Sequence, residues 1–194
     1  MFTGIVKEVG KVDKVSGDSA YIKLGIKSFD ILNDAEVSDS IAINGVCLTL
    51  IYKEKDVMFF EAIASTLKDT NIKRLKKGNL VNLESALTLN DKIGGHFVLG
   101  HVDAELKVKK ILTKKNFWEL EVDLPSKVRK YVLNNGSITI DGLSLTIKKV
   151  LSRSLIVHIV PYTYKNTTLS YKRIGDWLNI EFDYLLKHNV ENKK

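Results

Sequence analysis

The sequence predicts an all-β protein made of two small antiparallel barrels, one in each half of the chain. Short alternating apolar segments recur between turn signals roughly every 8–12 residues, which is typical of an antiparallel barrel or sandwich. In addition, Ser40–Leu50 is repeated 97 residues later as Ser137–Ile147. That interval is too long for one unit of a solenoid, so each copy is predicted to be a domain.

Length and composition fit this prediction. A chain of 194 residues forms one or two domains, and a half of about 95 residues buries only about two-thirds of its unfolded surface. We therefore expect the halves to pack together or to oligomerise. No apolar run approaches the roughly 20 residues that cross a bilayer, and Met1–Val6 lacks the features of a secretion signal. A single cysteine excludes an internal disulfide, so a cytoplasmic protein without a membrane partner is expected.

The formal net charge of +7 raises the alternative of a nucleic-acid-binding barrel. The lysines are scattered, with short clusters at 73–77, 107–110 and 148–149, and aromatic residues do not alternate with them. Binding of single strands without sequence preference uses such aromatic side chains as stacking platforms. We therefore expect a solvated lysine surface and no nucleic-acid partner. Salt-sensitive retention on single-stranded nucleic acid would support the alternative.

The first half contains alternating strands around one tight turn. Apolar and polar residues alternate over 20–26 as in a half-buried strand, and Asn44-Gly45 predicts a turn or bulge because both residues tolerate positive φ. A looser pattern over 66–75 predicts a short capped helix that ends near Gly78. The predicted strands are 3–15, 20–26, 40–43, 46–52, 57–63 and 80–85, with a helical turn at 29–32.

The second half repeats this order. Residues 97–102 correspond to 2–6, Thr163–Thr167 matches 66–70, and Glu181 falls opposite Glu84. Pro125 suits the first turn of a short helix over 125–133. The predicted strands are 106–112, 117–122, 137–150 (which contains the repeated turn), 155–160 and 177–182. We expect an N-terminal barrel at 1–96, a C-terminal barrel at 97–186, and a polar tail at 187–194 that is helical from Tyr184.

One position of the repeat changes its chemistry, because Cys47 of the first copy becomes Ser144 in the second. A free cysteine is often an inert small hydrophobe, but a hydroxyl is a poor replacement in a dry core. Both groups can hydrogen-bond or add to an electrophilic carbon. Thr49 and Thr146 are also repeated in otherwise apolar strands, either for their β-propensity or to place a hydroxyl in each of two pockets.

The four histidines allow structural and chemical interpretations. His96 and His101 lie five residues apart beside glycines, so on one strand they would face opposite sides and a two-histidine metal site is not expected. Each suits either a hydrogen bond or proton transfer near neutral pH. His158 and His188 are expected to be structural.

Four motifs in order resemble the riboflavin synthase family, alpha-chain type, whose members carry lumazine-binding domains. The resemblance spans nearly the whole chain and rests on Met1–Val6, Asn44–Thr49, Ile93–His101 and Ile140–Thr146. It implies two homologous six-stranded antiparallel Greek-key barrels, followed by a short C-terminal helix that gathers three subunits into a homotrimer.

The resemblance also implies a reaction. Two molecules of 6,7-dimethyl-8-ribityllumazine exchange a four-carbon unit and give riboflavin and 5-amino-6-ribitylaminouracil, with no redox cofactor and no metal. In this family the active site forms where the N-terminal barrel of one subunit meets the C-terminal barrel of another. Association with lumazine synthase is a further expectation.

Carried over by motif, two seats for lumazine are expected, each with a reactive residue. The first seat would be lined by Gly4, Ile5, Val6, Cys47, Leu48, Thr49, Glu61, Ala62, Ile63, Ala64, Ser65 and Thr66. The second would be lined by Gly100, His101, Val102, Ser144, Leu145, Thr146, His158, Ile159, Val160, Pro161, Tyr162 and Thr163, with Asn135 near it. As catalytic residues, His101 and Ser144 would handle protons or addition at one seat and Cys47 would serve the other.

Three positions depart from the family pattern, and one alternative function belongs to the same fold. Ser65 and Tyr162 stand where relatives commonly have an acidic residue, and Asn135 stands where a lysine is expected. Non-catalytic lumazine or flavin antenna proteins share the duplicated barrel. Those proteins lose the Gly-Gly-His junction and the Cys-Leu-Thr stretch, whereas Gly94–His96 and Cys47–Thr49 are present here. These residues favour the enzyme.

Overall fold

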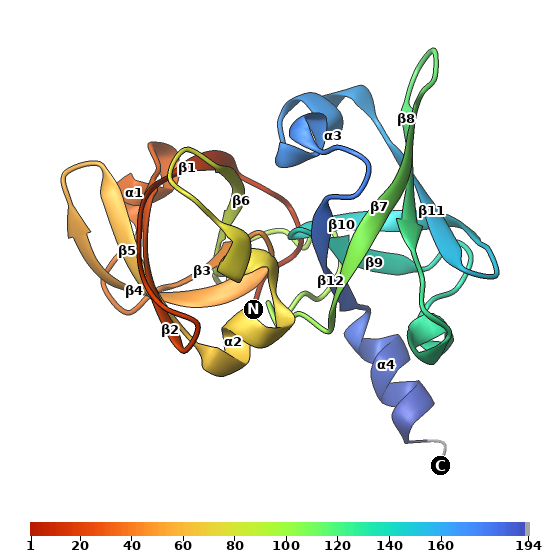
Figure 1. The fold of residues 1–194 in the computed structure, drawn as a ribbon, viewed down its shortest axis with the longest axis horizontal. Helices are drawn as coiled ribbons and strands as arrows, with labels where there is room; N and C mark the ends of the chain where they lie inside the picture. The colour runs from red at the N-terminus through yellow and green to blue at the C-terminus, as the bar shows by residue number, and fades with distance from the viewer. Residues whose placement is uncertain (193–194) are drawn as a thin grey trace.

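The computed structural model describes residues 1–192 and contains two closed, six-stranded antiparallel barrels that lie side by side (Figure 1). The first barrel closes in the order β1-β2-β5-β4-β3-β6. The second closes in the order β7-β8-β11-β10-β9-β12, so each strand occupies the place of its repeat mate. Neighbours that are not consecutive, such as β2 and β5, give the Greek-key connection. The predicted fold is confirmed.

The strand bounds follow the predicted pattern closely. The strands of the first barrel are β1 (Glu8–Gly17), β2 (Tyr21–Lys27), β3 (Ser40–Ile43), β4 (Val46–Glu54), β5 (Val57–Ile63) and β6 (Leu80–Ser85). Those of the second are β7 (Ala104–Thr113), β8 (Trp118–Asp123), β9 (Ser137–Ile140), β10 (Leu143–Val150), β11 (Ser154–Ile159) and β12 (Trp177–Phe182). Asn44 and Asp141 have φ of 47° and 44° before Gly45 and Gly142, which makes the tight hairpin turns predicted from the repeat.

Short helices follow several of the strands along the chain. They are α1 (Asp30–Asp34), α2 (Ala64–Asp69), η1 (Asn71–Arg74), η2 (Ser126–Tyr131), α3 (Pro161–Lys165), η3 (Thr168–Tyr171) and α4 (Tyr184–Glu191). The helix α4 projects from the second barrel at the C-terminal end (Figure 1). Its N-cap is Asp183, whose carboxylate accepts from Leu186 N at 3.1 Å. The last two residues of the predicted tail, 193–194, lie outside the described residues.

Two sequence-based element predictions were wrong. The single helix expected over 66–75 is broken at Thr70, where an extended backbone (φ −130°, ψ 159°) separates α2 from η1. The Thr70 hydroxyl donates to the carbonyl oxygen of Thr66 at 2.7 Å and so ends α2. The strand expected from residue 3 begins only at Glu8, because the N–H groups of Thr3 and Gly4 donate to the side chain of Glu84 instead of to a strand.

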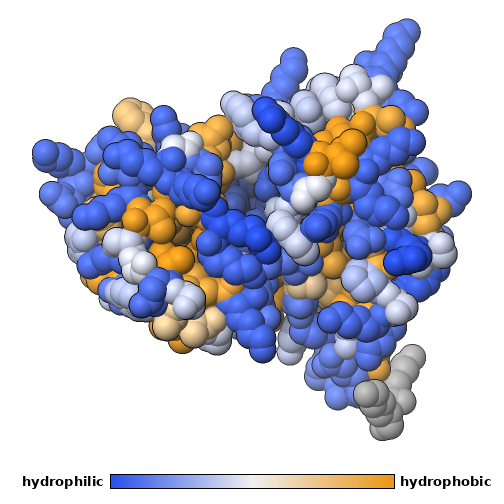
Figure 2. Space-filling model, viewed as in Figure 1, coloured by the Kyte–Doolittle hydropathy of each residue, from blue (hydrophilic) through white to orange (hydrophobic). Residues whose placement is uncertain are grey.

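Hydrophilic residues cover most of the face shown in Figure 2, between separate apolar patches on both barrels. Each barrel has its own apolar core, built from the inward residues of its strands. Within residues 1–192, no helix combines the length and apolar character needed to span a bilayer.

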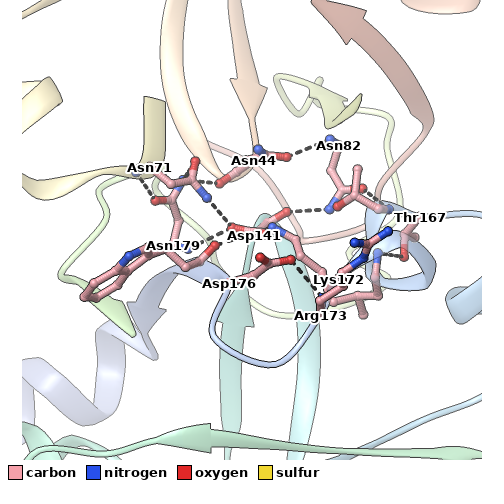
Figure 3. A network of polar contacts seen from close by, with 12 residues as sticks. Asn44, Asn71, Asn82, Asp141, Thr167, Lys172, Arg173, Asp176 and Asn179 are labelled. Atoms are coloured by element: carbon pink, nitrogen blue, oxygen red, sulfur yellow. Dashed lines mark hydrogen bonds and ion pairs between the residues drawn. The ribbon is translucent and has the colours of Figure 1, made fainter. Parts of the chain in front are cut away.

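Buried asparagines join the barrels across an approximate two-fold axis (Figure 3). Asn179 Nδ2 donates to the carbonyl oxygen of Asn44 at 2.9 Å. At the matching place, Asn82 Nδ2 donates to the carbonyl oxygen of Asp141 at 2.8 Å. The backbone N–H groups of the same two asparagines donate to the side chains of Asn44 and Asp141, at 2.8 and 2.7 Å. This exchange fixes how one barrel sits against the other.

The helical turns extend the same symmetry. Asn71 N, at the start of η1, donates to Asn179 Oδ1 at 2.7 Å. At the matching start of η3, Thr168 N donates to Asn82 Oδ1 at 2.8 Å. Each bond joins one barrel to the other, so the contact is built from equivalent halves.

One pair breaks this symmetry. The first copy has Asn44 and Leu75 where the second has Asp141 and Lys172. The side chain of Asp141 is 0% exposed and that of Lys172 is 15% exposed, and Lys172 Nζ lies 2.5 Å from Asp141 Oδ2. A neutral amide and an apolar residue in one copy are thus replaced by a buried ion pair in the other.

Candidate active site

Two segments cross from one barrel to the other. The segment after the N-terminus reaches the second barrel, and the segment after the inter-barrel junction reaches the first barrel. An isolated bridge joins them, with Phe2 N 2.7 Å from Val98 O and Val98 N 3.1 Å from Phe2 O. Beyond the bridge, the carbonyl oxygen of Gly4 accepts from Ser144 N at 2.8 Å. The carbonyl oxygen of Gly100 accepts from Cys47 N at 3.0 Å. Each segment therefore lies against a reactive residue of the repeat.

This crossing corrects the grouping expected from the sequence. Gly4, Ile5 and Val6 belong with Ser144 of the second barrel, not with Cys47. Gly100, and with it His101 and Val102, belongs with Cys47 of the first barrel. Within one chain, the segment that contains His101 therefore lies beside Cys47 and not beside Ser144. Motif order along the chain does not reveal which barrel a segment reaches.

Cys47 and Ser144 lie on the outer faces of their barrels. Val46, Leu48 and Leu50 of β4 point into the core, so Cys47 and Thr49 between them point outwards. Cys47 is half-buried and Thr49 is exposed, and Ser144 and Thr146 have the same exposure in β10. The thiol is therefore not an inert member of the barrel core, and both copies present a reactive group beside a hydroxyl.

Ser144 is coupled to a histidine. His96 Nδ1 lies 2.7 Å from Ser144 Oγ, and His96 Nε2 lies 3.2 Å from Oγ1 of Thr139, the residue opposite Ser144 in the sheet. If Nε2 carries the proton and donates it to Thr139, Nδ1 is free to accept the proton of the Ser144 hydroxyl. This is the geometry of a nucleophile or proton carrier with its base.

Burial sets the charge of this histidine. The surrounding protein lowers the pKa of His96 below its ordinary value because it disfavours the charged ring, and the negative charge of Asp183 opposes this only in part. The ring is therefore a neutral base near pH 7.

Sequence reasoning gave His96 as suited to a hydrogen bond or to proton transfer, but it did not place this histidine among the expected catalytic residues. The available signal was its position directly after Gly94-Gly95, at the junction between the two copies of the repeat.

Comparison with known proteins identifies the family. The family model described as "Lumazine binding domain" matches the chain twice, over residues 3–86 and 99–183. Riboflavin synthase of Bacillus subtilis is 40% identical over 190 residues, which cover 97% of this chain and 87% of the relative. Riboflavin synthase of Actinobacillus pleuropneumoniae is 37% identical over 188 residues, with the same coverage. The chain belongs to the riboflavin synthase family.

Solved structures agree with the fold of this riboflavin synthase family member. LumP complexed with riboflavin superimposes with a TM-score of 0.88 at 25% identity, covering 94% of this chain and 99% of that one. LumP complexed with 6,7-dimethyl-8-(1'-D-ribityl) lumazine superimposes with a TM-score of 0.86 at 24% identity and the same coverage.

A cleft of about 550 Å³ adjoins Ser144 in this family member. Its walls come from the crossed N-terminal segment, from β10 and from α3, so both barrels contribute. Of the expected seat residues, it contains Gly4, Ile5, Val6, Ser144, Tyr162 and Thr163. Tyr162 and Thr163 of α3 therefore line the same cleft as the N-terminal segment.

Other expected seat residues contribute unequally. Leu48, Ala62 and Ile159 point into the barrel cores and could meet a ligand only through their backbone. Glu61 accepts a hydrogen bond from the phenol of Tyr21, which raises the tyrosine pKa. His158 lies against Phe117, with ring centroids 4.4 Å apart, and 3.6 Å from Glu119. Glu61 of the first barrel and His158 of the second therefore have different neighbours.

The remaining expected residues lie at the surface or beside it. Asn135, an exposed residue with φ of 63°, donates its N–H to Ile147 O at 2.8 Å. Ala64, Ser65 and Pro161 are exposed, while Thr66 and Leu145 are half-buried. In residues 1–192, no cluster of three or more His, Cys, Asp or Glu side chains is placed to hold a metal ion.

Alanine at Gly95 is expected to disrupt the serine–histidine contact. A Cβ there would lie 2.1 Å from the carbonyl oxygen of Thr3 and 2.7 Å from Ser144 Cβ, and both positions are fixed by backbone. Such overpacking typically costs about 1–3 kcal/mol, so Gly95→Ala should lower both the melting temperature and kcat. Gly94→Ala is the control, because its Cβ would meet only the side chain of Ile5, at 3.2 Å from Cγ1 and 3.6 Å from Cδ1. Equal kcat for the two variants would contradict this account.

Proposed function

We propose that this chain is a riboflavin synthase. It transfers a four-carbon unit between two molecules of 6,7-dimethyl-8-ribityllumazine and forms riboflavin and 5-amino-6-ribitylaminouracil. The observation that carries the proposal is the repeated seat with different reactive groups, Cys47 in one barrel and Ser144 with His96 in the other. Two similar seats suit two copies of one substrate, and different side chains suit the unequal roles of donor and acceptor.

The chemistry needs a base, an electrophile and close positioning. The 7-methyl group of one lumazine is acidic because its carbanion delocalises into the ring, so a modest base is sufficient. The other lumazine accepts a nucleophile at a ring carbon next to nitrogen. Holding two reactants together can contribute about 7–11 kcal/mol, whereas one general acid or base contributes about 10²–10⁴-fold. Positioning is therefore the larger part of catalysis.

The two lumazine seats use different reactive side chains. Ser144, with His96 as its base, carries a proton or adds to the substrate in the second barrel. Cys47 serves the seat in the first barrel, where the crossed segment brings His101. This assignment replaces the pairing of His101 with Ser144 and keeps all three expected catalytic residues.

We propose further that the seats meet across subunits of a cytoplasmic homotrimer. Ile63 and its repeat mate Val160 lie next to α2 and α3 and are 60% and 57% exposed, so apolar surface borders both seats. Tyr184 and Leu185 of α4 are also exposed apolar residues. We expect the protein to be a trimer in sedimentation equilibrium. We expect Leu185→Asp to give a monomer with reduced activity. Association with lumazine synthase is tested by co-sedimentation of the two proteins.

Incubation of the purified protein with 6,7-dimethyl-8-ribityllumazine tests the activity. Riboflavin absorbance should rise while two lumazines disappear for each riboflavin formed. The second product, 5-amino-6-ribitylaminouracil, should appear in equal amount to riboflavin. Bound lumazine without any riboflavin would instead indicate an antenna-type binding protein, the alternative raised by the likeness to LumP.

A further inference from the structure

Two buried glutamates occupy matching positions at the ends of β6 and β12. Glu84 is 4% exposed and Glu181 is 5% exposed. Within residues 1–192, neither carboxylate forms a salt bridge with Lys, Arg or His. A buried charge requires partners, so the groups that face these carboxylates indicate what they do.

The partners are backbone N–H groups of the crossed segments. Glu84 Oε1 accepts from Thr3 N at 2.8 Å and from the Thr3 hydroxyl at 3.0 Å, and its Oε2 accepts from Gly4 N at 3.1 Å. Glu181 Oε1 accepts from Leu99 N at 2.7 Å, and its Oε2 accepts from Gly100 N at 2.9 Å. A carboxylate that accepts from consecutive N–H groups fixes the direction of a backbone segment.

Gly4 and Gly100 each form hydrogen bonds through both the N–H and the carbonyl oxygen. Gly4 donates its N–H to Glu84 of the first barrel and accepts from Ser144 N of the second barrel, at 2.8 Å. Gly100 donates its N–H to Glu181 of the second barrel and accepts from Cys47 N of the first barrel, at 3.0 Å. Each glutamate is thus connected, through the N–H and the carbonyl oxygen of one glycine residue, to the backbone of the reactive residue in the other barrel.

We propose that Glu84 and Glu181 are positioning residues, each of which fixes the reactive residue in the opposite barrel: Glu84 acts on Ser144, and Glu181 acts on Cys47. This inference rests on the proposed function for its catalytic meaning, but the connection itself is a property of the fold. It also explains why both copies of the repeat keep a glutamate at a buried position.

We call the hydrogen bonds from each glutamate to its backbone segment a clamp. Ionisation controls this clamp, because only the charged carboxylate accepts all of these N–H groups. Burial raises the pKa of both glutamates and that of Glu181 to about 7, with a further contribution from the negative charge of Asp103. Lys187 of α4 pairs with Asp103. Thr139, opposite Glu181 in the sheet, bonds to His96. The ionised fraction of Glu181 therefore rises with pH through the neutral range, and the hold on Gly100 strengthens with it.

Glu181→Gln and Glu84→Gln test the proposal as a matched pair, because an amide nitrogen in place of one oxygen cannot accept an N–H. Hydrogen exchange of the backbone amides is measured in the full-length protein. Glu181→Gln should lower the protection of the Leu99–His101 amides by about tenfold or more and leave Thr3–Ile5 unchanged. Glu84→Gln should do the reverse. Loss of protection at both segments in both variants, or at neither, would overturn the proposal.

Alkylation of Cys47 with iodoacetamide gives a second readout that needs no turnover. Glu181→Gln should change its rate severalfold, and Glu84→Gln should leave it at the wild-type value. If either variant does not fold, the wild type alone decides: protection of Leu99–His101, corrected for intrinsic exchange, should rise with pH through the neutral range, because burial raises the pKa of Glu181 to about 7. A flat profile would contradict the clamp. If each variant affects only its own segment but the protein forms no riboflavin, the proposed function is rejected and the positioning role of the two glutamates stands.

Discussion

Replacement of His96 by glutamine is expected to lower kcat for riboflavin formation by about 10²-fold, the lower end of what one general acid or base contributes. Glutamine can still hydrogen-bond to Ser144, but it cannot take its proton, so the contact at 2.7 Å would remain without its chemistry. The lower end applies because the substrate methyl group is itself acidic. Steady-state kinetics with a melting curve would separate loss of catalysis from loss of fold.

His101→Gln is the matched control for this experiment. His101 is exposed and belongs to the segment at Cys47, so its replacement should reduce kcat less than that of His96. A larger loss at His101 than at His96 would reverse the assignment of the two seats.

The same histidine predicts the acid limb of activity. Burial lowers the pKa of His96, so the ring stays neutral down to a pH below the ordinary histidine value of about 6.5 and gains its proton only in more acidic solution. The free base is the active form, so kcat falls as pH decreases through that lowered pKa. His96→Gln should remove this limb from the pH profile.

Asp141→Asn is expected to destabilise the protein by about 3–5 kcal/mol, the usual cost of removing one partner from a buried ion pair. The substitution leaves Lys172, which is only 15% exposed, without a counter-charge. Lys172→Leu should cost a similar amount because it leaves the fully buried carboxylate of Asp141 uncompensated.

The double variant Asp141→Asn/Lys172→Leu should recover most of this loss. It copies the equivalent position of the first barrel, where Asn44 accepts from Asn82 N at 2.8 Å and Leu75 takes the place of Lys172, so that this pair carries no charge. Asn at position 141 can accept from Asn179 N in the same way. Urea unfolding of the four proteins gives the coupling energy, and strictly additive losses would show that the pair is not coupled.

The alternation of residues and the repeat were sufficient to predict both barrels. Strands such as β5 and β6 begin and end where predicted, because one barrel face is apolar and each strand ends at a turn signal. Thr70 was missed because its hydroxyl ends α2 locally while the surrounding composition still favours a helix. The repeat alone drew attention to Cys47, Ser144, Thr49 and Thr146, and the family resemblance supplied most of the other candidate site residues.

The crossing of the two segments was not predictable from the repeat. Similarity between the copies shows that Gly4 and Gly100 occupy equivalent places, but not which barrel each one contacts. The contacts of Gly4 with Ser144 and of Gly100 with Cys47 depend on tertiary structure. His96 was not assigned a catalytic role for the related reason that its partners, Ser144 and Thr139, are distant in sequence.

The bridge between Phe2 and Val98 sets an order of assembly during synthesis. Residues 2–6 leave the ribosome long before Val98 and Ser144, which hold them in the finished protein. The first barrel can pair all six of its own strands by Ser85, yet its leading residues must wait until β10 has emerged. The pocket at Ser144 is therefore completed late, and a nascent chain that stops before residue 144 carries the thiol but no finished hydroxyl pocket.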